Sequence, residues 1–306
     1  MGADFASLNN VLETIKIFVG DALIDTLQII PFLFVTYLIL EFMEHRMSDS
    51  AIGKFEKAGP LGPIIGSALG IIPQCGFSSA ASTFYAGRVI TLGTLFAVYL
   101  STSDEMIPIF IAGGIPVEQL IIILVIKFVI GVIFGFAIDG IIKGFKLRKE
   151  TKNGFEIHKL CERDRCSCNH HDPKSKSKIL RPAILHTLQV TVFVFIITLL
   201  LNIVIEFSGG FENLSNLVET NKYLSVIITS VVGLIPNCAA SVAISQLYVD
   251  GILGFGALLA GLFDAAGVGL IVLFRNNRPM KQNLLITVAL LVISICIGMI
   301  ATLIIG

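Results

Sequence analysis

The run Gly70-Ile71-Ile72-Pro73-Gln74-Cys75 recurs 163 residues later as Gly233-Leu234-Ile235-Pro236-Asn237-Cys238, each time inside a long apolar stretch. The same offset aligns further small and polar residues on both sides of the run. They include Ser67 and Ser230, Ser78 and Ser241, Ser82 and Ser245, Tyr85 and Tyr248, and Gly93 and Gly256. Apolar residues match by chance in such stretches, so the paired Pro, Cys, Tyr and Ser residues carry the information. They predict an internal duplication.

The composition is that of a chain that lies in lipid. Residues of the set AVILMFWYC make up 55% of the sequence, charged residues 14%, and the mean hydropathy is +0.87. Several apolar stretches reach the length of about 20 residues that a helix needs to cross a bilayer: 22–43, 61–86, 89–113, 117–142, 183–205, 223–249, 252–274 and 283–305. The 22 basic and 22 acidic residues cancel, which argues against nucleic acid as a partner. We therefore predict an all-α polytopic membrane protein.

The basic residues are concentrated in one loop, which indicates the topology. Residues 143–181 hold more than half of the 22 Lys and Arg residues, so the positive-inside rule places this loop in the cytoplasm. Basic residues also place the loop at 276–282 inside, whereas 113–118 has none and is expected outside, as is the acidic stretch 207–222. The two halves then run in opposite directions, as inverted repeats do. Both termini are expected on the external face.

The interrupted apolar stretches predict how each repeat is built. Pro, Gly and polar residues break the segments 61–86 and 223–249, and the flanking charges favour a re-entrant helical hairpin with its tip at the duplicated run. Each repeat then has spanning helices, a hairpin and a broken helix, giving about ten helical segments. One continuous kinked span per segment is the alternative. The predicted parts are an amphipathic surface helix at 1–20, repeats at 21–142 and 182–306, and the loop at 143–181.

The two predicted tips supply the first group of candidate binding residues. Hairpin tips that enter from opposite faces meet near the middle of the bilayer, where side chains can replace a solute's hydration shell. Thiolates suit soft metal ions, whereas amide and hydroxyl oxygens suit harder ones. The candidates are Gln74, Cys75, Ser78, Ser79, Asn237, Cys238 and Ser241. The alternative is that each is a packing residue.

Acidic residues near the middle of two apolar segments supply the second group. Asp104 and Glu105 lie in segment 89–113, and Asp264 lies in segment 252–274. A charged side chain at that depth costs about 2.5–3.5 kcal/mol on insertion scales, so these acids are predicted to be functional. They can bind a cation, carry a coupling proton, or do both in turn. The alternative is that each carboxyl only caps the N-terminus of a half-helix.

Two further groups of metal-ligand type lie near the predicted cytoplasmic face. Glu41, Glu44 and His45 share one helix face, where they can bind a transition metal or simply be solvated. The central loop holds six residues of soft-metal type, namely His158, Cys161, Cys166, Cys168, His170 and His171. Their spacing matches no zinc finger, but their density predicts an accessory metal site.

Taken together, these motifs resemble one known family. The run Glu41-Phe42-Met43-Glu44-His45, the two tips, Thr102-Ser103-Asp104-Glu105 and the Cys/His loop are similar to bacterial and archaeal proteins labelled as ten-helix heavy-metal exporters, arsenic efflux proteins or manganese transporters. The resemblance covers nearly the whole chain. It implies a multi-pass efflux transporter in the inner membrane, with no enzyme activity. The metal ligands expected at the midplane are Asp104, Glu105, Asp264, Cys75 and Cys238.

The expected substrate is a divalent or heavy-metal ion such as manganese or zinc, exported by alternating access and coupled to protons or sodium. No cofactor is expected beyond the transported ion, and the sequence has no Gly-x-x-x-x-Gly-Lys-Ser/Thr nucleotide-binding motif. The expected partners are a small ion or solute, the lipid bilayer and, as an option, a second copy of the chain. Efflux of an arsenical or another small organic or anionic solute is the alternative, with Lys127 as the one candidate anion ligand inside a span. An intramembrane hydrolase that uses Asp104 and Asp264 is a distant third.

Overall fold

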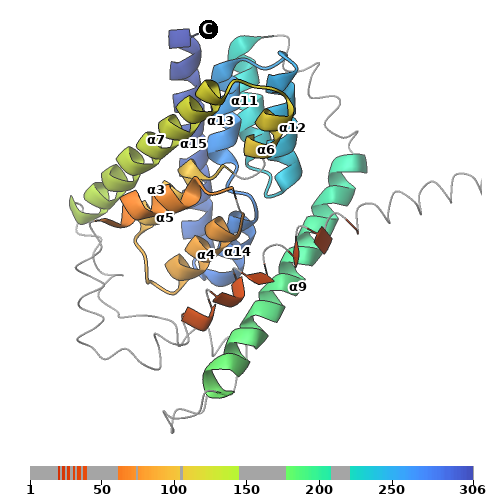
Figure 1. Ribbon diagram of the computed structural model, residues 1–306. Helices are drawn as coiled ribbons and strands as arrows, with labels where there is room; N and C mark the ends of the chain where they lie inside the picture. Colours follow the sequence, from red (N-terminus) through yellow and green to blue (C-terminus); the bar gives the residue numbers. More distant parts are fainter. Residues whose placement is uncertain are drawn as a thin grey trace, which may run out of the picture.

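The computed structural model describes residues 61–73, 75–103, 106–144, 177–207 and 221–305, together with scattered residues between 20 and 39. All regular secondary structure in these parts of the chain is helical (Figure 1). The helices of the first half are α3 (Gly62–Gly70), α4 (Cys75–Ala86), α5 (Leu92–Ser101), α6 (Met106–Ala112) and α7 (Val117–Gly144). Those of the second half are α9 (Ser177–Phe207), α11 (Lys222–Gly233), α12 (Cys238–Val249), α13 (Phe255–Asp264), α14 (Val268–Asn276) and α15 (Met280–Ile305).

Helices α7 and α15 are long, unbroken and on the outside of the bundle (Figure 1). Their 28 and 26 residues rise about 40 Å, more than the hydrocarbon core of about 30 Å. Only 22% of the candidate membrane window of each helix is buried, and apolar side chains such as Ile122 and Leu285 are more than half exposed. The outer faces of these two helices are therefore suited to contact with lipid.

Two further candidate spans are interrupted and lie in the centre. Leu92–Ala112 comprises α5 and α6, and Phe255–Asn276 comprises α13 and α14. In the second of these spans, 94% of the candidate membrane window is buried, against 22% in each unbroken span. Its interruption at 265–267 includes Gly267, whose φ of 52° is a left-handed conformation that glycine adopts readily. Polar residues in an apolar segment thus correctly predicted breaks in both central spans.

The segments that carry the duplicated run are also divided. A turn at 71–73 follows α3 before α4 begins at Cys75, and residues 234–237 separate α11 from α12. These helices have 9 to 12 residues and rise about 14–18 Å, so none of them crosses a bilayer alone. The predicted interruption at the two tips is confirmed. That both ends of each pair lie on one face of the membrane stays a prediction.

The two halves repeat the same packing. In the first half α5 packs against α3 and α7, and in the second half α13 packs against α11 and α15. The second helix of each divided segment packs against the other half: α4 packs against α14, and α12 packs against α6. Each half therefore places one helix of its tip segment on the broken span of the other half.

Glycine pairs bring the backbones together at equivalent places in the two halves. A Cβ atom on Gly135 would lie 2.9 Å from the carbonyl oxygen of Gly93, between α7 and α5. A Cβ atom on Gly298 would lie 2.8 Å from the carbonyl oxygen of Gly256, between α15 and α13. Both residues of the second pair follow those of the first by 163 positions. Close backbone approach through small residues is the usual way to pack helices in lipid.

Helix α9 lies beside this bundle (Figure 1). It packs against α14, and its ring of His186 stacks on Tyr37 with 5.4 Å between ring centroids. Several predicted parts lie outside the described residues: the surface helix at 1–20 except Gly20, nearly all of the loop at 143–181, and most of 207–222.

Candidate ion-binding site

Asp264 is the last residue of α13 and is fully buried. Its Oδ1 atom accepts a hydrogen bond of 3.0 Å from Ser294 of α15, and its Oδ2 atom accepts one from Ser230 of α11. A carboxylate at a helix C-terminus meets the negative end of the helix dipole, so it needs such donors. Three helices of the second half therefore meet at one acidic side chain.

This position contradicts one of the alternatives for Asp264. The carboxyl does not cap a half-helix N-terminus, because α14 begins after Gly267 and no side chain caps it. The two serine donors were not identified as site residues from the sequence. The sequence shows Ser230 only as the match of Ser67, and Ser294 is the one serine of a span that also carries Thr287 and Thr302. A polar residue in such a span is the signal that could have identified Ser294.

Lys127 is the second fully buried charged residue next to this break. It belongs to α7 of the first half, and its Nζ atom donates a hydrogen bond of 2.7 Å to the carbonyl oxygen of Leu262. The ammonium lies 5.4 Å from the centroid of the Phe263 ring and interacts electrostatically with Asp264. A lysine of the first half thus binds the C-terminal end of α13, two residues before Asp264.

The first half has hydroxyl groups at its own break. Ser101, Thr102 and Ser103 are buried, and Ser101 is the last residue of α5, as Asp264 is of α13. The Ser101 hydroxyl donates to Ala97 O at 2.7 Å, and the Thr102 hydroxyl donates to Val98 O at 2.8 Å. Hydroxyls that donate to the backbone keep oxygen lone pairs for a cation. The predicted ligands Asp104 and Glu105 lie outside the described residues.

The first tip contacts the beginning of α14. Ser78 and Ser79 are fully buried, and a Cβ atom on Gly269 would lie 2.8 Å from the Cβ atom of Ser78. The hydroxyl of Ser82, one turn further along α4, donates to the carbonyl oxygen of Gly269 at 2.7 Å. Gln74 and the side chain of Cys75 lie outside the described residues.

The second tip is built around the start of α12. Asn237 caps this helix, because its side-chain oxygen accepts a hydrogen bond of 3.1 Å from the amide of Ala239. Cys238 is buried in an apolar cluster that includes Val268, and the Ser241 hydroxyl donates to Cys238 O at 2.8 Å. Ser78 thus lies at the first turn of α14, just beyond the break that follows Asp264. Cys238 belongs to the same apolar cluster as Val268, the first residue of α14.

The donors in the described part of this region are mostly oxygens. Within the described residues, no three His, Cys, Asp or Glu side chains lie close enough to hold a metal ion together. The carboxylate of Asp264, the neighbouring hydroxyls and the carbonyls at the helix breaks are the available ligands. The other predicted metal ligands, Glu41, Glu44, His45 and the Cys/His set at 158–171, lie outside the described residues.

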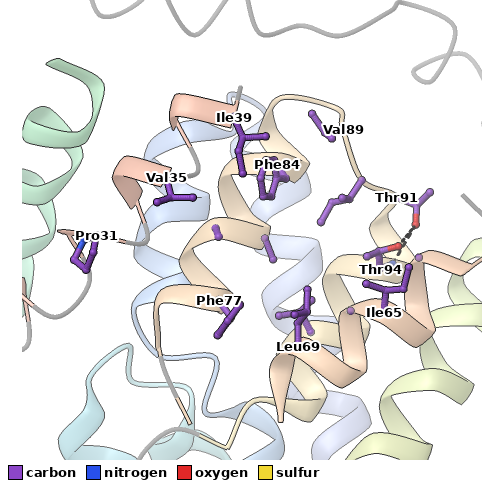
Figure 2. Close-up of a pocket in the computed structure, with 16 residues that line it drawn as sticks. Pro31, Val35, Ile39, Ile65, Leu69, Phe77, Phe84, Val89, Thr91 and Thr94 are labelled. Atoms are coloured by element: carbon purple, nitrogen blue, oxygen red, sulfur yellow. Dashed lines mark hydrogen bonds between the residues drawn. The ribbon is translucent and has the colours of Figure 1, made fainter. Parts of the chain in front are cut away.

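A separate cavity of about 610 Å³ lies among Pro31, Val35, Ile39, α3, α4 and the beginning of α5 (Figure 2). Its wall is apolar, with side chains such as Leu69, Phe77 and Phe84, and Thr91 and Thr94 are its polar lining residues. Among the described residues, no predicted site residue lines it. An ion needs oxygen, nitrogen or sulfur ligands, and of the described lining side chains only those of Thr91 and Thr94 offer oxygen.

Comparison with known proteins identifies the family. The chain matches the model of a protein family described as "Putative, 10TM heavy-metal exporter" over residues 13–185 and 183–305. No curated protein and no solved structure gives a match. Because the matched residues make up most of the chain, the protein belongs to this exporter family, as its motifs predicted. Family and apolar helices together make it a multi-pass membrane protein.

Proposed function

We propose that the chain exports a divalent metal ion across the inner membrane of a bacterium or archaeon, with Asp264 as a ligand. The observation that carries this proposal is a fully buried carboxylate at a break in the central span, with hydroxyls from two other helices bonded to it. Burying a charged acid at this depth costs about 2.5–3.5 kcal/mol on insertion scales. Packing alone does not need such a residue, and a cation-binding site does.

The type of ligand supports a hard divalent ion. Carboxylate, hydroxyl and carbonyl oxygens favour ions such as Mn²⁺ over soft ions, which prefer thiolates. Cys238, whose thiol lies in an apolar cluster, supplies sulfur only at the edge of this region. We therefore propose Mn²⁺ as the first ion to test and Zn²⁺ as the second.

The duplicated packing supports alternating access. In transporters with inverted repeats, two similar halves move against each other around a site near the membrane midplane. Here α4 packs on α14 and α12 on α6, so a displacement between the halves changes the surroundings of both central breaks. We propose that this movement exposes the site to each side in turn and is driven by exchange with protons or sodium.

An anionic or organic substrate, such as an arsenical, is the second candidate. The buried ammonium of Lys127 favours it, because a positive charge near the midplane attracts anions. However, this ammonium already donates a hydrogen bond to the carbonyl of Leu262 and interacts electrostatically with Asp264. Lys127 and Asp264 together carry no net charge. A cation that takes the place of the ammonium therefore fits this site better than an anion does.

The experiment is transport into proteoliposomes that contain the purified full-length protein. We expect uptake of Mn²⁺, with or without a pH or sodium gradient, to exceed that of protein-free vesicles, and Zn²⁺ to follow. Cd²⁺, arsenite and an organoarsenical complete the panel. Uptake of the arsenicals without any metal uptake would favour the second candidate and overturn the proposal.

A further inference from the structure

We infer that Lys127 is a tethered counter-cation for Asp264, which a transported cation must displace in order to bind. This inference rests on the proposed function and names what occupies the site when no substrate is bound. It also identifies Lys127 as a residue that sets the affinity of the site.

The contacts of Lys127 are those of a bound cation. The ammonium donates to the carbonyl oxygen of Leu262 at 2.7 Å and lies over the face of the Phe263 ring. Carbonyls at a helix C-terminus and aromatic faces both carry negative potential. These two groups hold the ammonium next to Asp264, the following residue of α13, with which it interacts electrostatically.

The two positions that match Asp264 and Lys127 by the repeat offset carry uncharged residues. At an offset of 163 residues, Ser101 stands where Asp264 stands, and Leu290 of the second half stands where Lys127 stands. Ser101 and Leu290 are as fully buried as the charged residues. The same helix arrangement is therefore also packed with a hydroxyl and an apolar side chain at these two positions. The two charges are therefore not part of what the repeat duplicates. One of them lies in each half of the chain.

Substrate binding and the lysine contact exclude each other for electrostatic reasons. A metal ion on the carboxylate of Asp264 and the ammonium of Lys127 would be like charges in one buried site. Binding of the ion therefore weakens the contact between α7 and the end of α13, and the contact weakens ion binding by the same factor. Conversely, the ammonium neutralises the empty site, which lowers the cost of burying the carboxylate while the empty carrier returns.

The test measures Mn²⁺ binding to the purified full-length protein in detergent, from the loss of the electron paramagnetic resonance signal of free Mn²⁺. Lys127→Gln removes the charge and keeps a donor, and Lys127→Met removes both. We expect either variant to bind Mn²⁺ at least about tenfold more tightly, a typical coupling between two ligands. Lys143→Met is the matched control, because Lys143 is an exposed lysine at the end of the same helix. It should bind as the wild type does.

The other outcomes separate this inference from the proposed function. If neither the wild type nor a Lys127 variant shows Mn²⁺ binding that Asp264→Asn abolishes, the proposed function fails. If such binding exists but Lys127→Gln leaves it unchanged or weaker, only the role of Lys127 fails. If both single Lys127 variants are unfolded while the uncharged pair Lys127→Met with Asp264→Asn folds, the ammonium is a structural partner and displacement is ruled out.

Discussion

The Nζ atom of Lys127 lies 2.7 Å from the carbonyl oxygen of Leu262, so a lysine of the first half is bonded to the end of a broken helix in the second half. Both residues are fully buried. This bond and the charge of Asp264 beside it connect the two halves at the place where the central span is interrupted. Movement between the halves and occupancy of the site are therefore expected to depend on each other.

The hydroxyls that hold Asp264 give the first prediction. Ser230→Ala or Ser294→Ala removes one of the donors to the carboxylate. Leaving a buried acceptor unsatisfied costs about 1–3 kcal/mol, so we expect Mn²⁺ transport to fall roughly tenfold for either variant. The measurement is initial uptake in proteoliposomes at equal protein density.

Ser67→Ala is the matched control for these variants. Ser67 occupies the position of Ser230 in the first half, but its hydroxyl makes a long bond of 3.4 Å to Ala97 O. We expect nearly normal transport from this variant. Equal losses in Ser67→Ala and Ser230→Ala would mean that the serines act on packing rather than on the carboxylate.

The glycine pairs give a prediction about stability. A Cβ atom on Gly256 would lie 2.5 Å from the carbonyl oxygen of Gly298, so Gly256→Ala forces α13 and α15 apart. Overpacking of this kind costs about 1–3 kcal/mol, and we expect a lower melting temperature in detergent. Gly140→Ala is the control, because a Cβ atom there meets no atom within 4 Å. An unchanged melting temperature for Gly256→Ala would contradict the observed helix contact.

The predicted topology is tested by labelling single cysteines in intact cells, in a background without reactive cysteines. A cysteine at Ser215 should react with an impermeant maleimide, because 207–222 is expected outside. A cysteine at Ser175 should react only after the cells are opened, because the loop at 143–181 is expected inside. The reverse pattern would rule out the proposed inverted arrangement.

The central loop gives a prediction about the accessory metal site. Replacing Cys161, Cys166 and Cys168 with Ser should weaken Zn²⁺ and Cd²⁺ binding by the full-length protein, since thiolates are the preferred ligands of these ions. The melting temperature and Mn²⁺ transport should stay close to those of the wild type. A triple variant that fails to fold would make the loop a structural element.

The sequence predicted where the helices are interrupted better than it predicted which residues contact each other. Pro73 and Pro236 mark the breaks between short helices, and the acid in segment 252–274 marks the break after α13, because polar or ring-constrained residues are poorly tolerated in a lipid-exposed span. The sequence could not predict whether Asp264 ends the helix before the break or caps the helix after it, since a break places both helix ends near the carboxyl.

The sequence patterns also could not predict that Lys127 contacts the C-terminal end of α13. The two elements belong to different halves, and their contact depends on how the halves pack. Hydropathy describes each span by itself and contains no information on which spans become neighbours. The repeat offset identified Ser230 as a duplicated position, but only the packing of α11, α13 and α15 gives its hydroxyl a partner.

The most direct test of the account is Mn²⁺ transport by Asp264→Asn in proteoliposomes, compared with the wild type and with Asp250→Asn, a matched change at an exposed aspartate. Asparagine keeps the shape of the side chain and removes its charge. We predict a fall of at least about tenfold for Asp264→Asn, which corresponds to about 1.4 kcal/mol at the limiting step, with normal expression and normal transport by Asp250→Asn. Asp104→Asn should behave in the same way. Transport by Asp264→Asn at the rate of the wild type would contradict the assignment of this carboxylate as a ligand of the transported ion.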